Sequence, residues 1–159
     1  MAGRIVLMPK AHVERVLTRM AYQIQEDHAG TAPIVLYGHQ VRGTWVAQRL
    51  AAALRPISTQ PVRVVTVGDE PLEADSDGYA VLVDDVIFSG RTLMRALRLV
   101  SSVRTPVVVR CAVLVDRGHR LLPVQPDFIG LVSPTKFDEH VEVEFDAAGN
   151  PESVVLRRG

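Results

Sequence analysis

The sequence predicts an α/β protein, with a central, mostly parallel twisted sheet flanked by helices and a small β unit near the C-terminal end. Three observations predict this class. Short apolar segments alternate with amphipathic helical patterns as far as Val115, and such alternation places parallel strands between helices. After Val115 the helical patterns stop and short β-like segments follow. The length of 159 residues suits one domain with a sizeable core.

The composition is that of an ordinary globular protein. Hydrophobic residues make up 47% and charged residues 23%. Lysine plus arginine equals aspartate plus glutamate at 18 each, so net charge argues neither for nor against nucleic-acid binding. Cys111 is the single cysteine, which fits a reducing cytoplasm. No apolar run approaches the roughly 20 residues of a membrane span, so we expect a cytoplasmic protein that does not cross a membrane.

The first helix is predicted over residues 11–28, because apolar side chains recur there every three or four residues. These side chains are Val13, Val16, Leu17, Met20 and Ile24. The turn-rich segment AGTAP separates this helix from a short buried strand at 34–38. A second helix is predicted over 42–55, ending before Pro56. Its inward-facing residues are expected to be Trp45, Val46, Leu50 and Ala53.

The remaining elements follow the same alternation as far as Val115. We predict a strand at 61–67, an acidic loop at 68–78, a strand at 79–85, a helix at 91–100 and a long apolar strand at 106–115. The short β-like segments that follow cover 127–132, 140–145 and 153–157. The middle one, HVEVEF, alternates apolar and polar residues, as a strand with one buried face does.

Asp84 and Asp85 stand side by side where the strand at 79–85 ends. Two adjacent carboxylates repel each other and are costly to dehydrate, so a polar ligand would explain their presence. Ligands of open α/β sheets bind beyond the carboxyl ends of the strands. The turn that follows leads into a helix N-terminus, where free N–H groups favour an anion. The expected contacts of this segment are Val86, Phe88, Ser89, Gly90, Arg91 and Thr92.

Two carboxylates beside a phosphate cradle suit a ribose 5-phosphate. The carboxylates would take the 2′ and 3′ hydroxyls, and the turn would take the phosphate. A capped helix with a solvated acidic turn would by itself explain two aspartates followed by Ser-Gly-Arg-Thr. The complete order of apolar strand, Asp-Asp, two apolar residues, Phe-Ser-Gly-Arg-Thr and helix is far more specific, and favours a phosphoribosyl site.

The segment VLVDDVIFSGRTL, at 81–93, resembles the phosphoribosyl pyrophosphate (PRPP) signature of type I phosphoribosyltransferases. The segments CAVLVDRGHRLLPVQPDFIG, at 111–130, and LTRMAY, at 17–22, are similar to the pyrimidine operon attenuator/uracil phosphoribosyltransferase family. The resemblance covers the chain from about Val13 to Phe145. It implies the type I phosphoribosyltransferase fold, as a single domain over 1–159 with a β hood at roughly 116–159 on a core at 9–115.

The segment GHQVRG, at 38–43, lies between a predicted strand and a predicted helix. By resemblance it is the pyrophosphate loop, in which backbone amides and Arg42 would hold the leaving group, with Gln40, Val41 and Gly43 as further contacts. The family usually has a lysine at or near the position of Gln40, so one positive charge is missing here. On the residues alone, a plain strand-to-helix turn with Gly43 as a packing glycine is the alternative.

The segment DRGHR, at 116–120, ends the long apolar strand. The resemblance makes it part of the hood over the base, where backbone groups of Val115, Asp116 and Arg117 would read the edge of uracil. We interpret His119 as a surface or binding residue rather than an acid or base, and Cys111 as an inert core thiol. The five histidines show no metal-ligand spacing. Mg²⁺ would instead arrive with PRPP, held largely by substrate oxygens.

The acidic segment GDEPLEADSDG, at 68–78, differs from the family pattern. Family members have a longer flexible segment there, with a Tyr-Arg-Asp-Asp-like run that closes over the reacting centre. Closure excludes water and completes the contacts of the transition state. A short segment of this kind weakens the case for turnover and leaves PRPP binding intact, so a PRPP- or nucleotide-sensing protein without turnover is one alternative.

The leading expectation is an enzyme of pyrimidine salvage that converts uracil and PRPP to UMP and pyrophosphate, with Asp84, Asp85 and Arg42 at the reacting centre. A second expectation is an attenuator that binds pyrimidine-operon leader RNA when a nucleotide is bound. The RNA contacts implied by resemblance are Thr18, Arg19, Arg120 and Lys136. A histidine that the family often shows in the first helix is Tyr22 here. The family pattern also implies a homodimer or a higher homo-oligomer.

Overall fold

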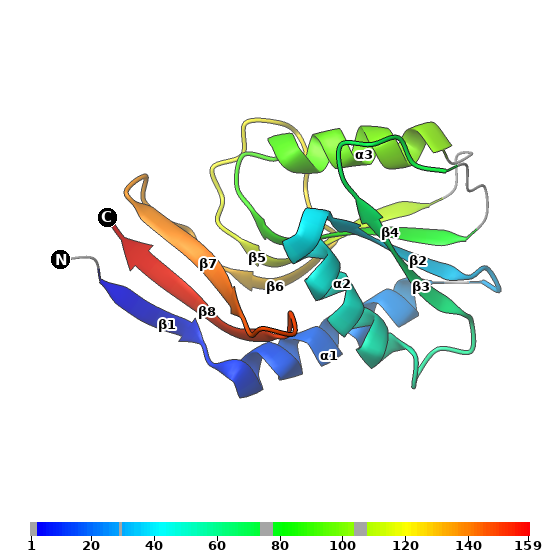
Figure 1. The fold of residues 1–159 in the computed structure, drawn as a ribbon, viewed down its shortest axis with the longest axis horizontal. Helices are drawn as coiled ribbons and strands as arrows, with labels where there is room; N and C mark the ends of the chain where they lie inside the picture. Colours follow the sequence, from blue (N-terminus) through cyan, green and yellow to red (C-terminus); the bar gives the residue numbers. More distant parts are fainter. Residues whose placement is uncertain (1–2, 29, 74–77, 104–107) are drawn as a thin grey trace.

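The structure is a computed structural model that describes residues 3–28, 30–73, 78–103 and 108–159 (Figure 1). In chain order, its elements are β1 (Arg4–Met8), α1 (Lys10–Asp27), β2 (Ile34–His39), α2 (Gln40–Leu54), β3 (Val62–Val67), β4 (Tyr79–Ile87), α3 (Arg91–Val103), β5 (Val109–Asp116), β6 (Phe128–Val132), β7 (Glu139–Phe145) and β8 (Pro151–Arg158). The predicted α/β class is confirmed.

The larger sheet has five strands in the order β3-β2-β4-β5-β6, and every neighbouring pair is parallel. From β2 the chain adds β3 on one side, and then adds β4, β5 and β6 on the other. Ligands of open α/β sheets bind at such a switch point, here between β2 and β4. Helices α1 and α2 cover one face and α3 covers the other (Figure 1). Such two-sided cover explains why the central strands are almost continuously apolar.

Alternate residues of β4 pack into two core layers. Val81 and Val83 join the layer under α1 and α2, whereas Ala80 and Leu82 join the layer under α3. The apolar residues predicted to face inward from the first helix are all buried. In α2, Val46 and Leu50 are buried, while Trp45 and Ala53 are partly buried.

The smaller sheet is antiparallel, with the order β1-β8-β7. The sequence did not predict β1, a short segment whose partner β8 lies at the other end of the chain, with Arg4 opposite Arg157. Of the short β segments after Val115, β6 pairs in parallel with β5 in the larger sheet, and β7 and β8 form the smaller one. The region 116–159 therefore contributes strands to both sheets.

Two boundaries near the predicted site differ from the sequence expectation. Strand β4 runs to Ile87, because Val86 and Ile87 still pair with β5 opposite Val115 and Asp116. Helix α2 begins at Gln40 rather than at residue 42. The two aspartates thus lie within β4, near its end. Residues 40 and 41, which were expected to precede the helix, belong to the first turn of α2.

Candidate functional site

The carboxyl end of β4 carries Asp84 and Asp85, which the structure places in different environments. Asp84 is buried, with 7% of its surface exposed, and Asp85 is half-buried. One oxygen of Asp84 accepts the N–H of Asp85 at 2.9 Å, and one oxygen of Asp85 accepts the N–H of Val86 at 2.8 Å. Each carboxylate keeps a second oxygen for another partner.

The second oxygen of Asp84 lies 3.4 Å from Nδ1 of His39, the last residue of β2. Burial raises the pKa of Asp84 to about 6, and the contact with His39 opposes that rise. The same contact raises the pKa of His39 above its ordinary value. The sequence analysis did not single out His39. The parallel pairing of its strand with β4 is the signal that could have identified it.

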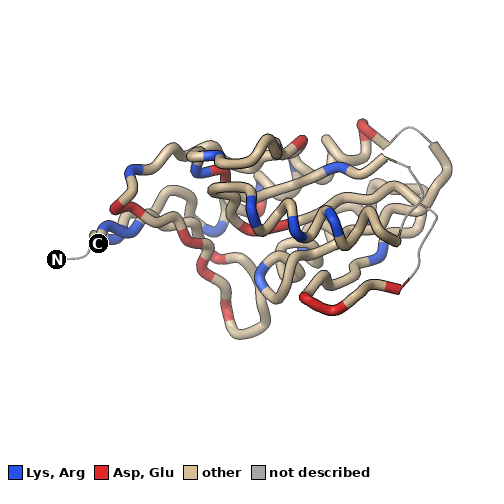
Figure 2. The backbone as a smooth tube through the Cα atoms, turned by 90° about the horizontal axis from the view of Figure 1, so that it is seen from above, with Lys and Arg blue, Asp and Glu red and all other residues tan. Residues whose placement is uncertain are grey.

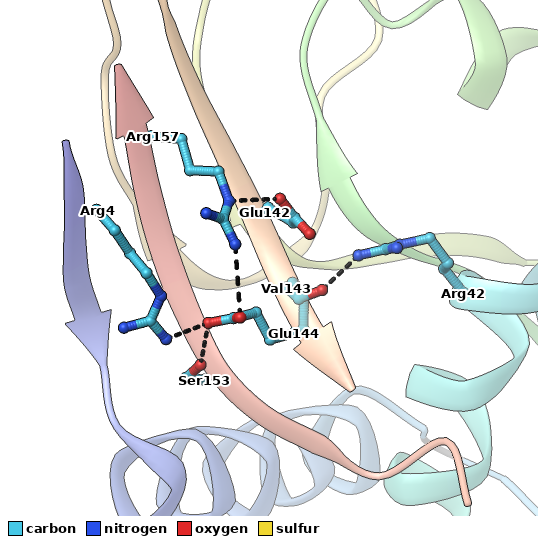
Figure 3. A network of polar contacts seen from close by, with 7 residues as sticks. All are labelled: Arg4, Arg42, Glu142, Val143, Glu144, Ser153 and Arg157. Atoms are coloured by element: carbon cyan, nitrogen blue, oxygen red, sulfur yellow. Dashed lines mark hydrogen bonds and ion pairs between the residues drawn. The ribbon is translucent and has the colours of Figure 1, made fainter. Parts of the chain in front are cut away.

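The second oxygen of Asp85 accepts a hydrogen bond from Nε of Arg42 at 3.0 Å. Arg42 also donates through Nη2 to the carbonyl oxygen of Val143 in β7, a contact visible in Figure 3. Its guanidinium carbon lies 5.1 Å from the ring centre of Phe145. Arg42 therefore connects the start of α2, the end of β4 and the smaller sheet.

The close approach of α2 to β4 depends on Gly43. A Cβ atom at this position would lie 2.8 Å from the carbonyl oxygen of Val83 and 3.3 Å from a carboxylate oxygen of Asp84. Gln40 has a positive φ of 50° at the first residue of the helix, and Val41 is exposed. The structure thus brings the segment 38–43 against the two aspartates.

The turn after β4 leads directly into the N-terminus of α3. Gly90 has a φ of 91°, which favours glycine, and α3 begins at Arg91. The side-chain oxygen of Ser89 accepts the N–H of Arg91 at 3.3 Å, and Thr92 is exposed. The first N–H groups of a helix have no intrahelical acceptor, so this end of α3 can receive a phosphate.

Arg120 fastens this turn to the end of β5. Its guanidinium donates to the carbonyl oxygen of Phe88 at 2.7 Å and to a carboxylate oxygen of Asp116 at 2.7 Å. The other oxygen of Asp116 accepts the N–H of Gly118 at 2.9 Å. Asp116 and Val115 are buried. Asp116 therefore shapes the connection after β5 through its side chain, and Arg120 lies within the site instead of on an outer surface.

Arg117 lies beside an aromatic cluster that opens to solvent. Its guanidinium carbon is 4.4 Å from the ring centre of Phe88, and its Nε donates to the hydroxyl of Thr135 at 3.1 Å. Burial lowers the pKa of Arg117. The ring of His119 lies 5.5 Å from Phe88 and 5.1 Å from Phe137, which is 85% exposed. Phe137 was not predicted as part of the site, because its partners are remote in sequence.

The other residues expected to contact RNA are spread over the molecule. Arg19 donates to the carbonyl oxygens of Ile129 and Gly130, which attaches α1 to β6. The hydroxyl of Thr18 donates to a carbonyl oxygen one turn earlier in α1. Lys136 is exposed in the connection between β6 and β7. Figure 2 shows positive and negative residues interspersed along much of the backbone.

Three further observations concern the cysteine, metal binding and membrane-spanning helices. Cys111 is buried in β5, and burial raises its pKa, as expected for an inert core thiol. Among the described residues, no group of three or more His, Cys, Asp and Glu side chains is arranged to hold a metal ion. In that same part of the chain, no helix is both long and apolar enough to span a bilayer.

Comparison with known proteins identifies this arrangement. The family described as "Phosphoribosyl transferase domain" matches residues 9–147. A protein of Geobacter sulfurreducens named "Bifunctional protein PyrR" is 37% identical, over 99% of this chain and 100% of its own length. A protein of the same name from Ligilactobacillus salivarius is 36% identical, over 92% of this chain and 94% of its own.

Solved structures share the fold at low sequence identity. A hypoxanthine phosphoribosyltransferase of Trypanosoma cruzi in complex with IMP superimposes with a TM-score of 0.75 at 20% identity, over 96% of this chain and 89% of that one. A hypoxanthine phosphoribosyltransferase of Staphylococcus aureus gives a TM-score of 0.67 at 15% identity, over 84% of this chain and 80% of that one. These two likenesses concern the fold.

Proposed function

Because the chain belongs to the PyrR-like branch of the type I phosphoribosyltransferases, we propose that it acts as a uracil phosphoribosyltransferase, converting uracil and PRPP to UMP and pyrophosphate. One observation carries the proposal: Asp84 and Asp85 stand near the carboxyl end of β4, and the turn at 88–90 leads from this strand into the N-terminus of α3. Hydroxyl acceptors and a phosphate cradle are thereby combined on one short segment, as PRPP requires.

Each part of PRPP has a partner in this proposal. The two carboxylates accept the ribose 2′ and 3′ hydroxyls. The 5-phosphate binds the segment from Phe88 to Thr92, where the first N–H groups of α3 have no acceptor within the helix. Arg42, which now contacts Asp85 and Val143, turns to the pyrophosphate as it accumulates charge. Positioning these groups converts a reaction between two molecules into one within a complex.

The reaction needs no covalent nucleophile from the protein. A bond forms between a ring nitrogen of uracil and C1 of the ribose, while the bond from C1 to the pyrophosphate oxygen breaks. The leaving pyrophosphate takes the bonding electrons, and the ring nitrogen releases its proton. The ribose passes through an oxocarbenium-like state, which the nearby carboxylates of Asp84 and Asp85 stabilise by their negative charge.

Mg²⁺ is expected to accompany PRPP. The described side chains hold no cluster that would bind a metal by itself, which suits an ion held mainly by phosphate oxygens and water. Mg²⁺ bound in this way would neutralise charge on the pyrophosphate as it departs. The base would lie near the end of β5, where Phe88 offers an aromatic face. The N–H of Arg117 already donates to the carbonyl oxygen of Ile87 and the carbonyl oxygen of Asp116 already accepts from Ser133, so uracil would be read there through carbonyl lone pairs that these bonds leave open.

RNA attenuation is the second proposed function, favoured by relatives that carry the name "Bifunctional protein PyrR". Binding to leader RNA should weaken as salt increases, since phosphate contacts release counterions. Exposed Lys136 and the part of Arg19 that remains exposed are the basic groups we would vary first. A gel-shift titration with pyrimidine-operon leader RNA, with and without UMP at low salt, tests this function, and no binding at low salt contradicts it.

The short acidic segment at 68–78 bears on turnover. Residues 74–77 lie outside the described part of the chain. The alignment with the Geobacter sulfurreducens relative spans 177 positions, against 159 residues in this chain, so the relative carries residues without a counterpart here. The acidic segment itself, which lacks the Tyr-Arg-Asp-Asp-like run, favours a third proposed function, a protein that binds PRPP or a nucleotide and turns it over slowly or not at all.

The first experiment is an assay of UMP formation from uracil, PRPP and Mg²⁺. The parent is compared with the double variant Asp84→Asn/Asp85→Asn and with the control Asp138→Asn, which changes an exposed acid between β6 and β7. We expect UMP from the parent and the control, and a loss of at least about a hundredfold in the double variant. PRPP binding without product in the parent would favour the sensing or RNA-binding function.

A further inference from the structure

The carboxylate of Asp84 has an ionisable partner, His39, from a strand other than its own. We propose that His39 is a positioning residue: as an imidazolium it holds Asp84 as an ionised, oriented acceptor for the ribose of PRPP. This inference rests on the proposed function, because the contact between His39 and Asp84 can assist PRPP binding only if the protein binds PRPP. The contact itself can be tested in the protein alone.

The topology of the larger sheet forces the two side chains together. Strands β2 and β4 are parallel neighbours, with Gly38 opposite Val83, so the next residue along each strand is His39 and Asp84 respectively. The two side chains are only 14% and 9% exposed, and Nδ1 lies 3.4 Å from the carboxylate oxygen. An ion pair with so little contact with water is weakly screened.

The charges around this pair explain why an imidazolium is needed. Asp85 is adjacent and is paired with Arg42, and Arg95 of α3 is a more distant cation that acts on His39. With His39 neutral, the ionised carboxylate of Asp84 would have no cation in direct contact. PRPP brings several negative charges of its own, so an uncompensated carboxylate would repel it.

The sequence supports the same inference. Gln40, the residue after His39, is uncharged, and Arg42 of the same segment is paired with Asp85. His39 is the neighbouring residue and points its ring at Asp84. Of the segment at 38–43, His39 is therefore the residue that can place a positive charge against Asp84, on an imidazole whose protonation changes near neutral pH.

The effects on the two pKa values agree with this geometry. Burial and the neighbouring Asp85 raise the pKa of Asp84, and the interactions with His39 lower it. Removing the imidazolium therefore leaves burial and Asp85, which favour the protonated carboxyl, opposed by the N–H of Asp85, which donates to Asp84 at 2.9 Å. A protonated Asp84 has lost an acceptor for a ribose hydroxyl, so PRPP binding should weaken on the acidic side of the Asp84 titration.

The test compares the parent with His39→Gln, which keeps a hydrogen-bond donor without charge, and with His39→Lys, which restores the charge. His140→Gln, at an exposed histidine in β7, is the matched control. The Asp84 carboxyl is titrated by NMR with ¹³C-labelled aspartate, and PRPP binding with Mg²⁺ is measured by calorimetry from about pH 5.5 to 8.5. We expect the Asp84 titration to move upward by about one pH unit in His39→Gln, with about tenfold weaker PRPP binding on its acidic side. His39→Lys and His140→Gln should keep the parent titration.

Each failure has a distinct meaning. An unchanged Asp84 titration in a folded His39→Gln variant overturns the inference. If that variant does not fold, the imidazole of His39 is titrated in the parent, and a pKa at or below the ordinary value for histidine overturns it equally. If the parent binds no PRPP at any pH, the proposed function fails, while the carboxyl titration still decides whether His39 sets the charge on Asp84.

Discussion

Asp84 is a residue at which stability and function make opposite demands. Its burial raises its pKa in the folded protein to about 6, above the ordinary value that it has in the unfolded chain. Below the ordinary pKa the carboxyl is neutral in both states and burial costs little. As the pH rises through about 6, the folded protein must hold a dehydrated charge, so this residue lowers stability at neutral and alkaline pH.

We therefore expect Asp84→Asn to stabilise the fold while it weakens PRPP binding. At about pH 8 the free energy of unfolding should increase by about 1 to 3 kcal/mol, reduced by the lost contact with His39. The gain should vanish toward about pH 4. Urea unfolding at both pH values measures it, with Asp138→Asn as the control at an exposed site. A loss of stability at pH 8 would contradict the assignment of Asp84 as a buried charge.

The sequence singled out candidate site residues that follow one another along the chain. It missed residues whose contacts are with partners far away in the sequence. Asp84, Asp85 and the following turn were predicted because strand, carboxylates and helix start follow one another directly. His39 was missed because its partner is in a neighbouring strand, 45 residues later in the chain. Phe137 was missed for the same reason, since its neighbour His119 belongs to another connection.

At the scale of the elements, the turn between β4 and α3 is held by the side chain of Arg120, which belongs to the connection after β5. Arg120 joins the carbonyl of Phe88 to Asp116, and Ser89 accepts the N–H of Leu121 at 2.9 Å. A phosphate cradle must hold its N–H groups in place before the ligand arrives, because ordering them on binding would cost free energy.

Arg120→Ala should therefore raise the KM for PRPP by about tenfold, which is equivalent to about 1.4 kcal/mol of binding. The buried carboxylate of Asp116 also loses its partner, so stability should fall by about 1 to 3 kcal/mol. Initial rates of UMP formation and thermal unfolding measure the two effects. Arg98→Ala, at an exposed position of α3, should change neither. An unchanged KM in Arg120→Ala would show that the turn is ordered without this side chain.

The contact of α2 with β4 depends on the absence of a side chain at Gly43. In Gly43→Ala, the new methyl group would meet the carbonyl of Val83 at 2.8 Å and displace the helix together with Arg42. Overpacking of this kind typically costs about 1 to 3 kcal/mol, and a small displacement of Arg42 should lower kcat by about tenfold or more. The matched control is Gly3→Ala, where a Cβ also meets no atom within 4 Å. Equal unfolding curves and kcat for the two variants would contradict this account.

At the scale of the whole molecule, the smaller sheet is joined to the larger one through α2. Trp45 packs against Phe145, with ring centres 5.0 Å apart, and Arg42 reaches the carbonyl of Val143. Gly149, in the connection between β7 and β8, lies so close that a Cβ atom would be 2.5 Å from the Trp45 ring. The face of the smaller sheet also carries a network of ion pairs, in which Arg157 contacts Glu142 at 3.0 Å (Figure 3).

Gly149→Ala should separate the smaller sheet from α2. Both strain at a φ of 83° and the clash with Trp45 lower stability, by about 2 to 4 kcal/mol together. Because Trp45 is the single tryptophan, its fluorescence emission should shift to longer wavelength as water reaches the ring. Gly118→Ala separates the two causes, since its φ of 76° is also positive but its Cβ would meet no atom within 4 Å. The same emission shift in both variants would argue against the packing contact.

The sequence predicted the helices and most parallel strands of the larger sheet, but it did not predict β1 or the place of β6. The helices and parallel strands of the larger sheet carry strong apolar patterns, because both faces of that sheet are covered. Strand β1 was missed, since it is short, three of its five residues are exposed, and its pairing with β8 is visible only in the fold. Strand β6 was predicted as a β segment, yet its place in the larger sheet depends on pairing with β5 that sequence periodicity does not reveal.

The pairing of β1 with β8 has a consequence for how the protein is made. In the smaller sheet β8 lies between β1 and β7, so neither outer strand can pair before β8 has left the ribosome. The larger sheet is complete once β6 has emerged, and can assemble while synthesis continues. Contacts between segments that are far apart in the sequence, such as β1 and β8, form slowly. The nascent protein should thus pass through a stage in which the segment proposed to bind PRPP is folded while the strand that Arg42 contacts is still unpaired.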